Sequence, residues 1–267
     1  QEMSSVRKYT GMTAEEVEHL NEEFKKIDTR SSRESLNKLA QEAGRLGLKS
    51  EEDVLGFVRA ADKINVALDD LGGGATLTLS KLTDIFGDKK RLGVEQSLLS
   101  VGSVINELSQ NCTASAPYLA TFAQRMAGVG AQAGLTVPQI MACGSVLDSQ
   151  GQAVEMSASA LSKLTMNLFK NSGQIAKATG LDVKKFKETA VKDTNAALIM
   201  LLERLHELGN MDVLAPMFKE MGENGVRSSQ VLAALAGNID LVKEQQVAAN
   251  IAFEEATSIQ KEFDIKS

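Results

Sequence analysis

Residues 134–140 read Gly134-Leu135-Thr136-Val137-Pro138-Gln139-Ile140 and carry the signals for the end of one helix and the start of another. A glycine can close a helix in the left-handed conformation. A threonine followed three residues later by glutamine forms a capping box, in which each side chain accepts a hydrogen bond from the other residue's backbone N–H. Proline costs little in a first turn, and Leu135 and Ile140 occupy the two positions of a hydrophobic staple. The stretch therefore predicts a tight corner between two α-helices.

The same arrangement occurs twice more along the chain. In Gly11-Met12-Thr13-Ala14-Glu15-Glu16-Val17, Glu16 completes the box, and Met12 and Val17 form the staple. In Gly180-Leu181-Asp182, the staple partner is Phe186. Three such signals predict a chain of discrete helices joined by tight turns. Weaker versions occur at Gly47-Leu48, Gly93-Val94 and Gly225-Val226.

Between these corners the apolar residues recur at helical spacing. Val17, Leu20, Phe24 and Ile27, for example, fall on one helical face. Aromatic residues make up only 4% of the chain, and no convincing alternating strand pattern is found. We therefore expect a compact all-α fold rather than a single rod. The expected helices lie near residues 14–27, 32–46, 51–69, 75–87, 94–109, 116–133, 137–150, 152–170, 183–191, 194–208, 212–221, 226–236 and 239–264.

The 267 residues are interpreted as one helical module, 1–267, with subdivisions suggested near residues 110 and 172. The sequence starts at Gln1 and ends in the helical pattern 248–263, so we expect it to be an excerpt of a longer polypeptide. Because it opens in polar sequence, we expect no secretory signal peptide. No run approaches the roughly 18 uninterrupted apolar residues of a membrane span, so no stable span is expected.

Charge and reactive residues argue against several classes of function. A net charge of −6 argues against a large nucleic-acid footprint, which needs clustered Lys and Arg. Cys112 and Cys143 lie too far apart for a metal or redox motif. His19 and His206 each stand alone in a charged, amphipathic helical pattern. We expect no enzyme activity, no metal and no cofactor.

Two glycine-rich stretches resemble ligand-binding loops only loosely. Gly128-Val129-Gly130-Ala131-Gln132-Ala133 matches G-x-G-x-x-A, but a dinucleotide site needs a strand before it, and residues 118–127 predict helix. Gly72-Gly73-Gly74 lacks the Lys and Ser or Thr of a phosphate-binding loop. The preceding Asp69-Asp70 pair could hold a cation, but the favoured interpretation is a solvated pair beside a flexible turn.

The most unusual feature is a segment with almost no charge. Between Glu107 and Glu155, only Arg125 and Asp148 are charged. The favoured interpretation is a helix pair buried within the domain. The alternative is a surface for self-association, for a partner protein or for transient membrane contact. Small residues permit close helix approach, so the packing or interaction surface is predicted at Gly128, Gly130, Ala131 and Gly134.

The order of these segments resembles the core region of phage tail tape measure proteins, the phage-related minor tail protein family. The resemblance runs over nearly the whole chain and rests on short ordered motifs, none of them catalytic. They include the helix start at 10–17, the Ala-rich helix with its glycine turn at 39–54, the small-polar segment 111–119, Ala133-Gly134-Leu135-Thr136, and the stretches 221–226 and 231–235.

The resemblance implies a structural component of a phage or prophage tail, with no active-site residues to carry over. Such proteins take part in tail assembly, tail length determination and genome ejection. It implies a place in the virion tail, and in the host cytoplasm during assembly, with tail tube, tail chaperone or baseplate proteins as partners. The frequent corners predict a folded module attached to the ruler. The alternatives are a helical scaffold of a bacterial, non-phage system and a membrane-active ejection module that uses the low-charge segment.

Overall fold

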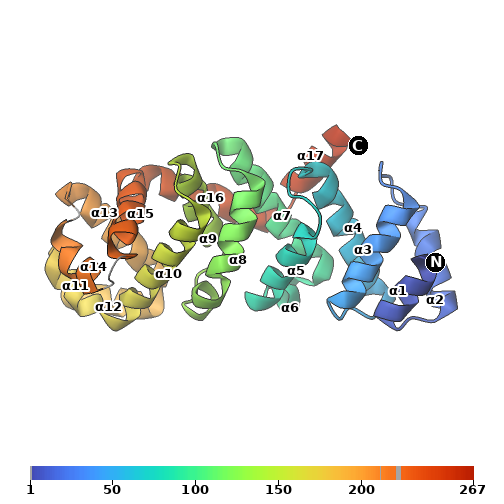
Figure 1. The fold of residues 1–267 in the computed structure, drawn as a ribbon, viewed down its shortest axis with the longest axis horizontal. Helices are drawn as coiled ribbons and strands as arrows, with labels where there is room; N and C mark the ends of the chain where they lie inside the picture. Colours follow the sequence, from blue (N-terminus) through green and yellow to red (C-terminus); the bar gives the residue numbers. More distant parts are fainter. Residues whose placement is uncertain (1, 211, 221–223) are drawn as a thin grey trace. The chain divides into compact units, whose positions relative to one another are not determined.

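The computed structural model describes residues 2–210, 212–220 and 224–267. Within these ranges the chain consists of α-helices and one 3-10 turn, with no strand (Figure 1). The prediction of an all-α fold is therefore confirmed. The first three residues of the stretch 221–226 and the predicted end of a helix at residue 221 lie outside the described residues.

The chain divides into two compact units, and both boundaries fall within helices. Unit 1 contains the residues up to Asn106 together with Ala252–Ser267, and unit 2 is Glu107–Ile251. Unit 1 holds α1 (Glu2–Thr10), α2 (Ala14–Phe24), α3 (Arg33–Arg45), α4 (Glu51–Ala67), α5 (Ala75–Ile85), α6 (Asp88–Leu92), most of α7 (Val94–Asn111) and α17 (Ser258–Lys266). Unit 2 holds α8 (Ala116–Gln132), α9 (Val137–Ser149), α10 (Val154–Lys170), α11 (Ser172–Thr179), α12 (Val183–Lys192), α13 (Thr194–Leu208), the 3-10 turn η1 (Asp212–Leu214), α14 (Ala215–Glu220), α15 (Asn224–Gly237) and most of α16 (Ile239–Glu255).

Unit 1 is built around α4. Its apolar residues Val54, Phe57 and Ile64 are fully buried, and the small side chains between them are buried as well. It packs against α2, α3, α5 and α17. Most of its residues from Val54 to Ala67 are buried, so α4 lies at the centre of the unit.

A buried pair of amides fixes α2 against α3. Asn21 Nδ2 donates to Asn37 Oδ1 at 3.2 Å, and Asn37 Nδ2 donates back to Asn21 Oδ1 at 2.9 Å. Each Nδ2 also donates to the backbone carbonyl four residues earlier in its own helix. Because both amides are paired, their burial is compensated, and the two helices are held in one register.

Unit 2 is built around α9, which packs against α8, α10 and α15. Helices α8 and α10 also pack directly against each other, so α8, α9 and α10 form one cluster (Figure 1). A second reciprocal amide pair occurs in this unit between α13 and α16. Asn195 Nδ2 donates to Gln246 Oε1 at 3.0 Å, and Gln246 Nε2 donates to Asn195 Oδ1 at 2.9 Å.

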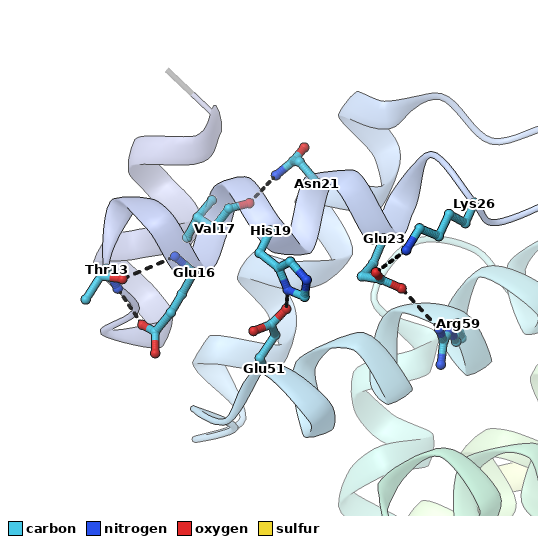
Figure 2. Close-up of polar contacts among 9 residues, drawn as sticks. All are labelled: Thr13, Glu16, Val17, His19, Asn21, Glu23, Lys26, Glu51 and Arg59. Atoms are coloured by element: carbon cyan, nitrogen blue, oxygen red, sulfur yellow. Dashed lines mark hydrogen bonds and ion pairs between the residues drawn. The ribbon is translucent and has the colours of Figure 1, made fainter.

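The three predicted helix starts are confirmed. The Thr13 backbone N–H donates to Glu16 Oε2 at 2.7 Å, and the Glu16 N–H donates to Thr13 Oγ1 at 3.2 Å, a complete capping box (Figure 2). Thr136 and Gln139 form a second box. Asp182 caps α12 by accepting the Lys185 N–H at 2.7 Å.

Other predicted boundaries are wrong. Helices α1, α6 and α11 were not expected. The predicted helix 239–264 ends at Glu255, and α17 begins anew at Ser258, because Ala256 has a φ of 52° that no α-helix accommodates. Gly225 was predicted to precede a helix but lies inside α15. The segment 212–214 is a 3-10 turn rather than α-helix.

Candidate interaction surface

The low-charge segment forms the last turn of α7, the helices α8 and α9, and the turns that connect them. On α9 every residue from Val137 to Leu147 is buried except Gln139. The favoured interpretation, burial of this segment within the domain, therefore holds for α9 in unit 2. Helix α8 is buried on one side only, and its other side, including Gln124, Arg125 and Gly128, is exposed.

The two charged residues of the segment both serve its internal geometry. Asp148 Oδ2 accepts the backbone N–H of Ser115 at 2.8 Å, which joins the end of α9 to the start of α8. Arg125 lies 3.6 Å from Glu155 at the start of α10, and this pair is exposed. The two charged residues of the segment thus each connect two of the helices α8, α9 and α10.

Tyr118 of α8 also connects this helix to the start of α10. Its hydroxyl donates to the Gln152 carbonyl oxygen at 2.8 Å and lies 3.0 Å from Ser157 Oγ. Burial raises the pKa of this hydroxyl to about 12, so it stays a neutral donor. Its ring stacks on Phe122 with the centroids 6.2 Å apart.

The close helix approach occurs at a glycine that sequence reasoning did not select. A Cβ atom on Gly144 of α9 would lie 2.7 Å from Phe122 Cδ1 of α8. Only glycine permits the two helices to meet there. The signal was present as the small-residue run Cys143-Gly144-Ser145 in an otherwise apolar helix, but it acquires meaning only once the partner ring is known.

The four residues predicted to form the packing or interaction surface, Gly128, Gly130, Ala131 and Gly134, are not the residues at this close approach. A Cβ atom on Gly128 or Gly134 would meet no other heavy atom within 4 Å, so neither marks close packing within the unit. Gly134, with a φ of 80°, forms the turn after α8, in which the Leu135 N–H donates to the Gly130 carbonyl at 2.9 Å. Gly130 is buried and Ala131 half-buried. A role for these four residues toward another chain stays a prediction.

The cysteines, the glycine-rich stretch of α8 and Asp69 each have their own local surroundings. Burial raises the pKa of the Cys143 thiol to about 12, and both cysteines are free. Gly128 and Gly130 lie within α8. Asp69 pairs with Lys266 at 3.6 Å. Across the described residues, no group of three His, Cys, Asp or Glu side chains is arranged to hold a metal ion.

His19 takes part in an exposed contact between α2 and α4. Its Nδ1 faces the Glu51 carboxylate, and the neighbouring Glu23 joins Lys26 and Arg59 (Figure 2). The hydrogen bond to Glu51, together with the charge of that carboxylate, raises the pKa of His19 above its ordinary value. Glu51 lies at the first position of α4, where a carboxylate is favoured. The arrangement joins two helices electrostatically.

These features define a helical structural module, in which polar side chains cap, clamp and align helices. Residues 14–218, about three quarters of the chain, match the family described as phage-related minor tail protein. The chain belongs to that family. Neither a search of curated proteins nor a search of solved structures found a match. Among the helices of the described residues, none has the length and apolar character needed to cross a bilayer.

Proposed function

We propose that the chain is a folded core module of a tape measure protein, acting in tail assembly, tail length determination and genome ejection. The observation that carries this proposal is the family match over residues 14–218 on a chain that turns a corner after every few helical turns. A ruler converts residue count into distance at about 1.5 Å per helical residue. Two compact units of short helices cannot serve as such a rod, so the module accompanies the ruler.

The partners proposed for this module are tail tube, tail chaperone or baseplate proteins, met in the host cytoplasm during assembly. What supports them is membership of a tail protein family. The division of the 267-residue module near residues 110 and 172 also remains a proposal, as does self-association.

The test removes unit 2, residues 107–251, in frame from the phage or prophage that encodes the chain. A rod of this length would span about 220 Å. We expect the assembled tails, measured by electron microscopy, to shorten by far less than this length, because a folded module adds little to a ruler. An in-frame duplication of the unit is the matched control and should lengthen the tails equally little. Shortening and lengthening by the full rod length would show that the segment is itself the ruler, and absence of its peptides from purified virions would remove it from the tail.

A further inference from the structure

Unit 2 carries a concentrated basic face although the chain as a whole is acidic. Between residues 163 and 192, seven lysines stand against two acidic residues, a formal charge of +5 in a chain of −6. We call these lysines the lysine face; they are Lys163, Lys170, Lys177, Lys184, Lys185, Lys187 and Lys192. All but the half-buried Lys163 are exposed, and none forms an ion pair with any described residue.

The three helices that carry the lysines pack against one another. Helices α10, α11 and α12 contact one another in each pairing. The side chain of Lys187 lies over Gly173, with its Cδ 3.6 Å from the position of a Cβ there. Lys177 is one turn beyond Gly173 on the same side of α11, and Lys184 is one turn before Lys187 on α12. Lys177, Lys184 and Lys187 therefore lie on the adjoining sides of α11 and α12.

The acidic residues of this region are few and mostly engaged. Asp182 accepts the Lys185 N–H, and Asp193 accepts the Ala196 N–H at 2.9 Å, so both carboxylates cap helices. Glu188 is the remaining carboxylate among the exposed residues of α12. Asp212 lies in η1, which packs against α11. The field of the lysine face is thus only partly offset by its neighbours.

Large apolar side chains are exposed among these lysines. Val191 is 78% exposed and lies one turn from Lys187 and two turns from Lys184 on one face of α12. Met166 and Phe169 are 41% and 45% exposed, and both lie between Lys163 and Lys170 on α10. Clustered lysines with exposed apolar side chains are the composition of a surface that lies on an anionic bilayer.

We propose that the lysine face, with Met166, Phe169 and Val191, binds the surface of an anionic lipid bilayer. The lysines meet lipid phosphates, and the three apolar side chains enter the headgroup region. A nucleic-acid backbone would neutralise the lysines equally well, but it has no apolar region into which the three apolar side chains could insert. The exposed apolar residues therefore favour lipid. This binding is independent of the ruler-associated role proposed above, and either can fail without the other.

The test is vesicle co-flotation of the whole 267-residue chain. Vesicles of phosphatidylglycerol and phosphatidylcholine in equal amounts should bind the protein at low salt, and pure phosphatidylcholine should not. The charge variant combines Lys177→Glu, Lys184→Glu and Lys187→Glu. Because each lysine near such a surface contributes about a fivefold factor, we expect at least about a 100-fold loss of binding. The apolar variant, Phe169→Ser with Val191→Ser, should also lose binding.

The matched control changes net charge equally on the other unit. It combines Lys49→Glu, Lys81→Glu and Lys90→Glu, three exposed lysines of unit 1, and should bind vesicles as the unaltered chain does. Circular dichroism verifies that every variant remains helical. The proposal is overturned if the unaltered chain does not bind anionic vesicles, or if the control loses as much vesicle binding as the charge variant. It is also overturned if the apolar variant binds vesicles normally and the charge variant loses only binding to duplex DNA, which would assign the face to nucleic acid.

Discussion

At the scale of single residues, Asp62 of α4 is the side chain most at odds with its surroundings. It is 1% exposed, and neither of its carboxylate oxygens has a hydrogen-bond partner among the described residues. Burying a polar group without a partner costs free energy, and burying a charge without one costs more.

Replacing Asp62 by its neutral isostere should therefore stabilise the protein. We expect Asp62→Asn to raise the free energy of unfolding by about 1–3 kcal/mol. The measurement is urea denaturation followed by circular dichroism. Asp28→Asn, at an exposed position, is the control and should change stability by no more than about 0.5 kcal/mol. A less stable Asp62→Asn protein would show that the carboxylate is compensated in solution.

Two glycines of the low-charge segment should respond to alanine with opposite signs. Gly144→Ala places a methyl group against the Phe122 ring, so it should cost about 1–3 kcal/mol through overpacking. Gly128→Ala fills open space on helix α8 and should stabilise by about 0.5–1 kcal/mol. Thermal unfolding of the two variants side by side provides the comparison. Equal effects would mean that α8 and α9 do not meet at Gly144.

The His19–Glu51 contact should make stability depend on pH. The pKa of His19 is raised in the folded protein, first by the Glu51 hydrogen bond and then by its charge. Its contribution is therefore fully present below the unfolded pKa and is lost as pH rises through the folded pKa. We expect His19→Gln to lower the melting temperature more at about pH 5.5 than at about pH 8.5. In a Glu51→Gln background this difference should vanish, and its persistence would assign the effect to another group.

At the scale of elements, the helix starts could be predicted because their chemistry is local. Thr13, Thr136 and Asp182 each find their partner within three residues along the chain. A sequence pattern therefore contains the whole interaction. Helices α6 and α11 lack this chemistry, since neither has a side-chain cap hydrogen bond, and both are short. Their existence depends on packing that a local pattern does not contain.

The break between α16 and α17 shows what local patterns omit. No glycine or proline marks it, yet Ala256 adopts a positive φ. The new helix is held from α7, where Ser103 Oγ accepts the Ile259 N–H at 3.2 Å and Asn106 Nδ2 donates to the Ser258 carbonyl at 3.2 Å. These partners are more than 150 residues away in sequence. Tertiary contacts override local propensity here, as they do at Gly144.

The capping boxes should contribute measurably to stability. Thr136→Ala removes the side-chain acceptor for the Gln139 N–H and should cost about 1 kcal/mol. Thr136→Ser keeps the hydroxyl and should cost clearly less. Urea midpoints at constant denaturant slope provide the measurement. If alanine and serine behave alike, the hydroxyl is not the stabilising group, and the corner at residues 134–140 is held by its staple.

At the scale of the whole molecule, the low charge of residues 108–154 has a structural explanation in unit 2. A core helix such as α9 excludes charged side chains because it has no exposed face on which to place them. Helix α8 does have an exposed side, so its lack of charge is explained only in part by burial within the unit. We therefore expect different solvent access for the two helices, with α9 protected within unit 2 and α8 exposed on one side.

Hydrogen exchange of the chain, measured by mass spectrometry over a range of protein concentrations, separates them. We expect the amides of α9 to be among the slowest to exchange, at a rate independent of concentration, because they open only when unit 2 unfolds. If the exposed side of α8 binds a second copy, protection of α8 should grow with concentration while that of α9 stays constant. The variant Gln124→Glu with Gln132→Glu places charge on that side and should then abolish the concentration dependence. Fast exchange of α9 at every concentration would contradict its place as the core of unit 2.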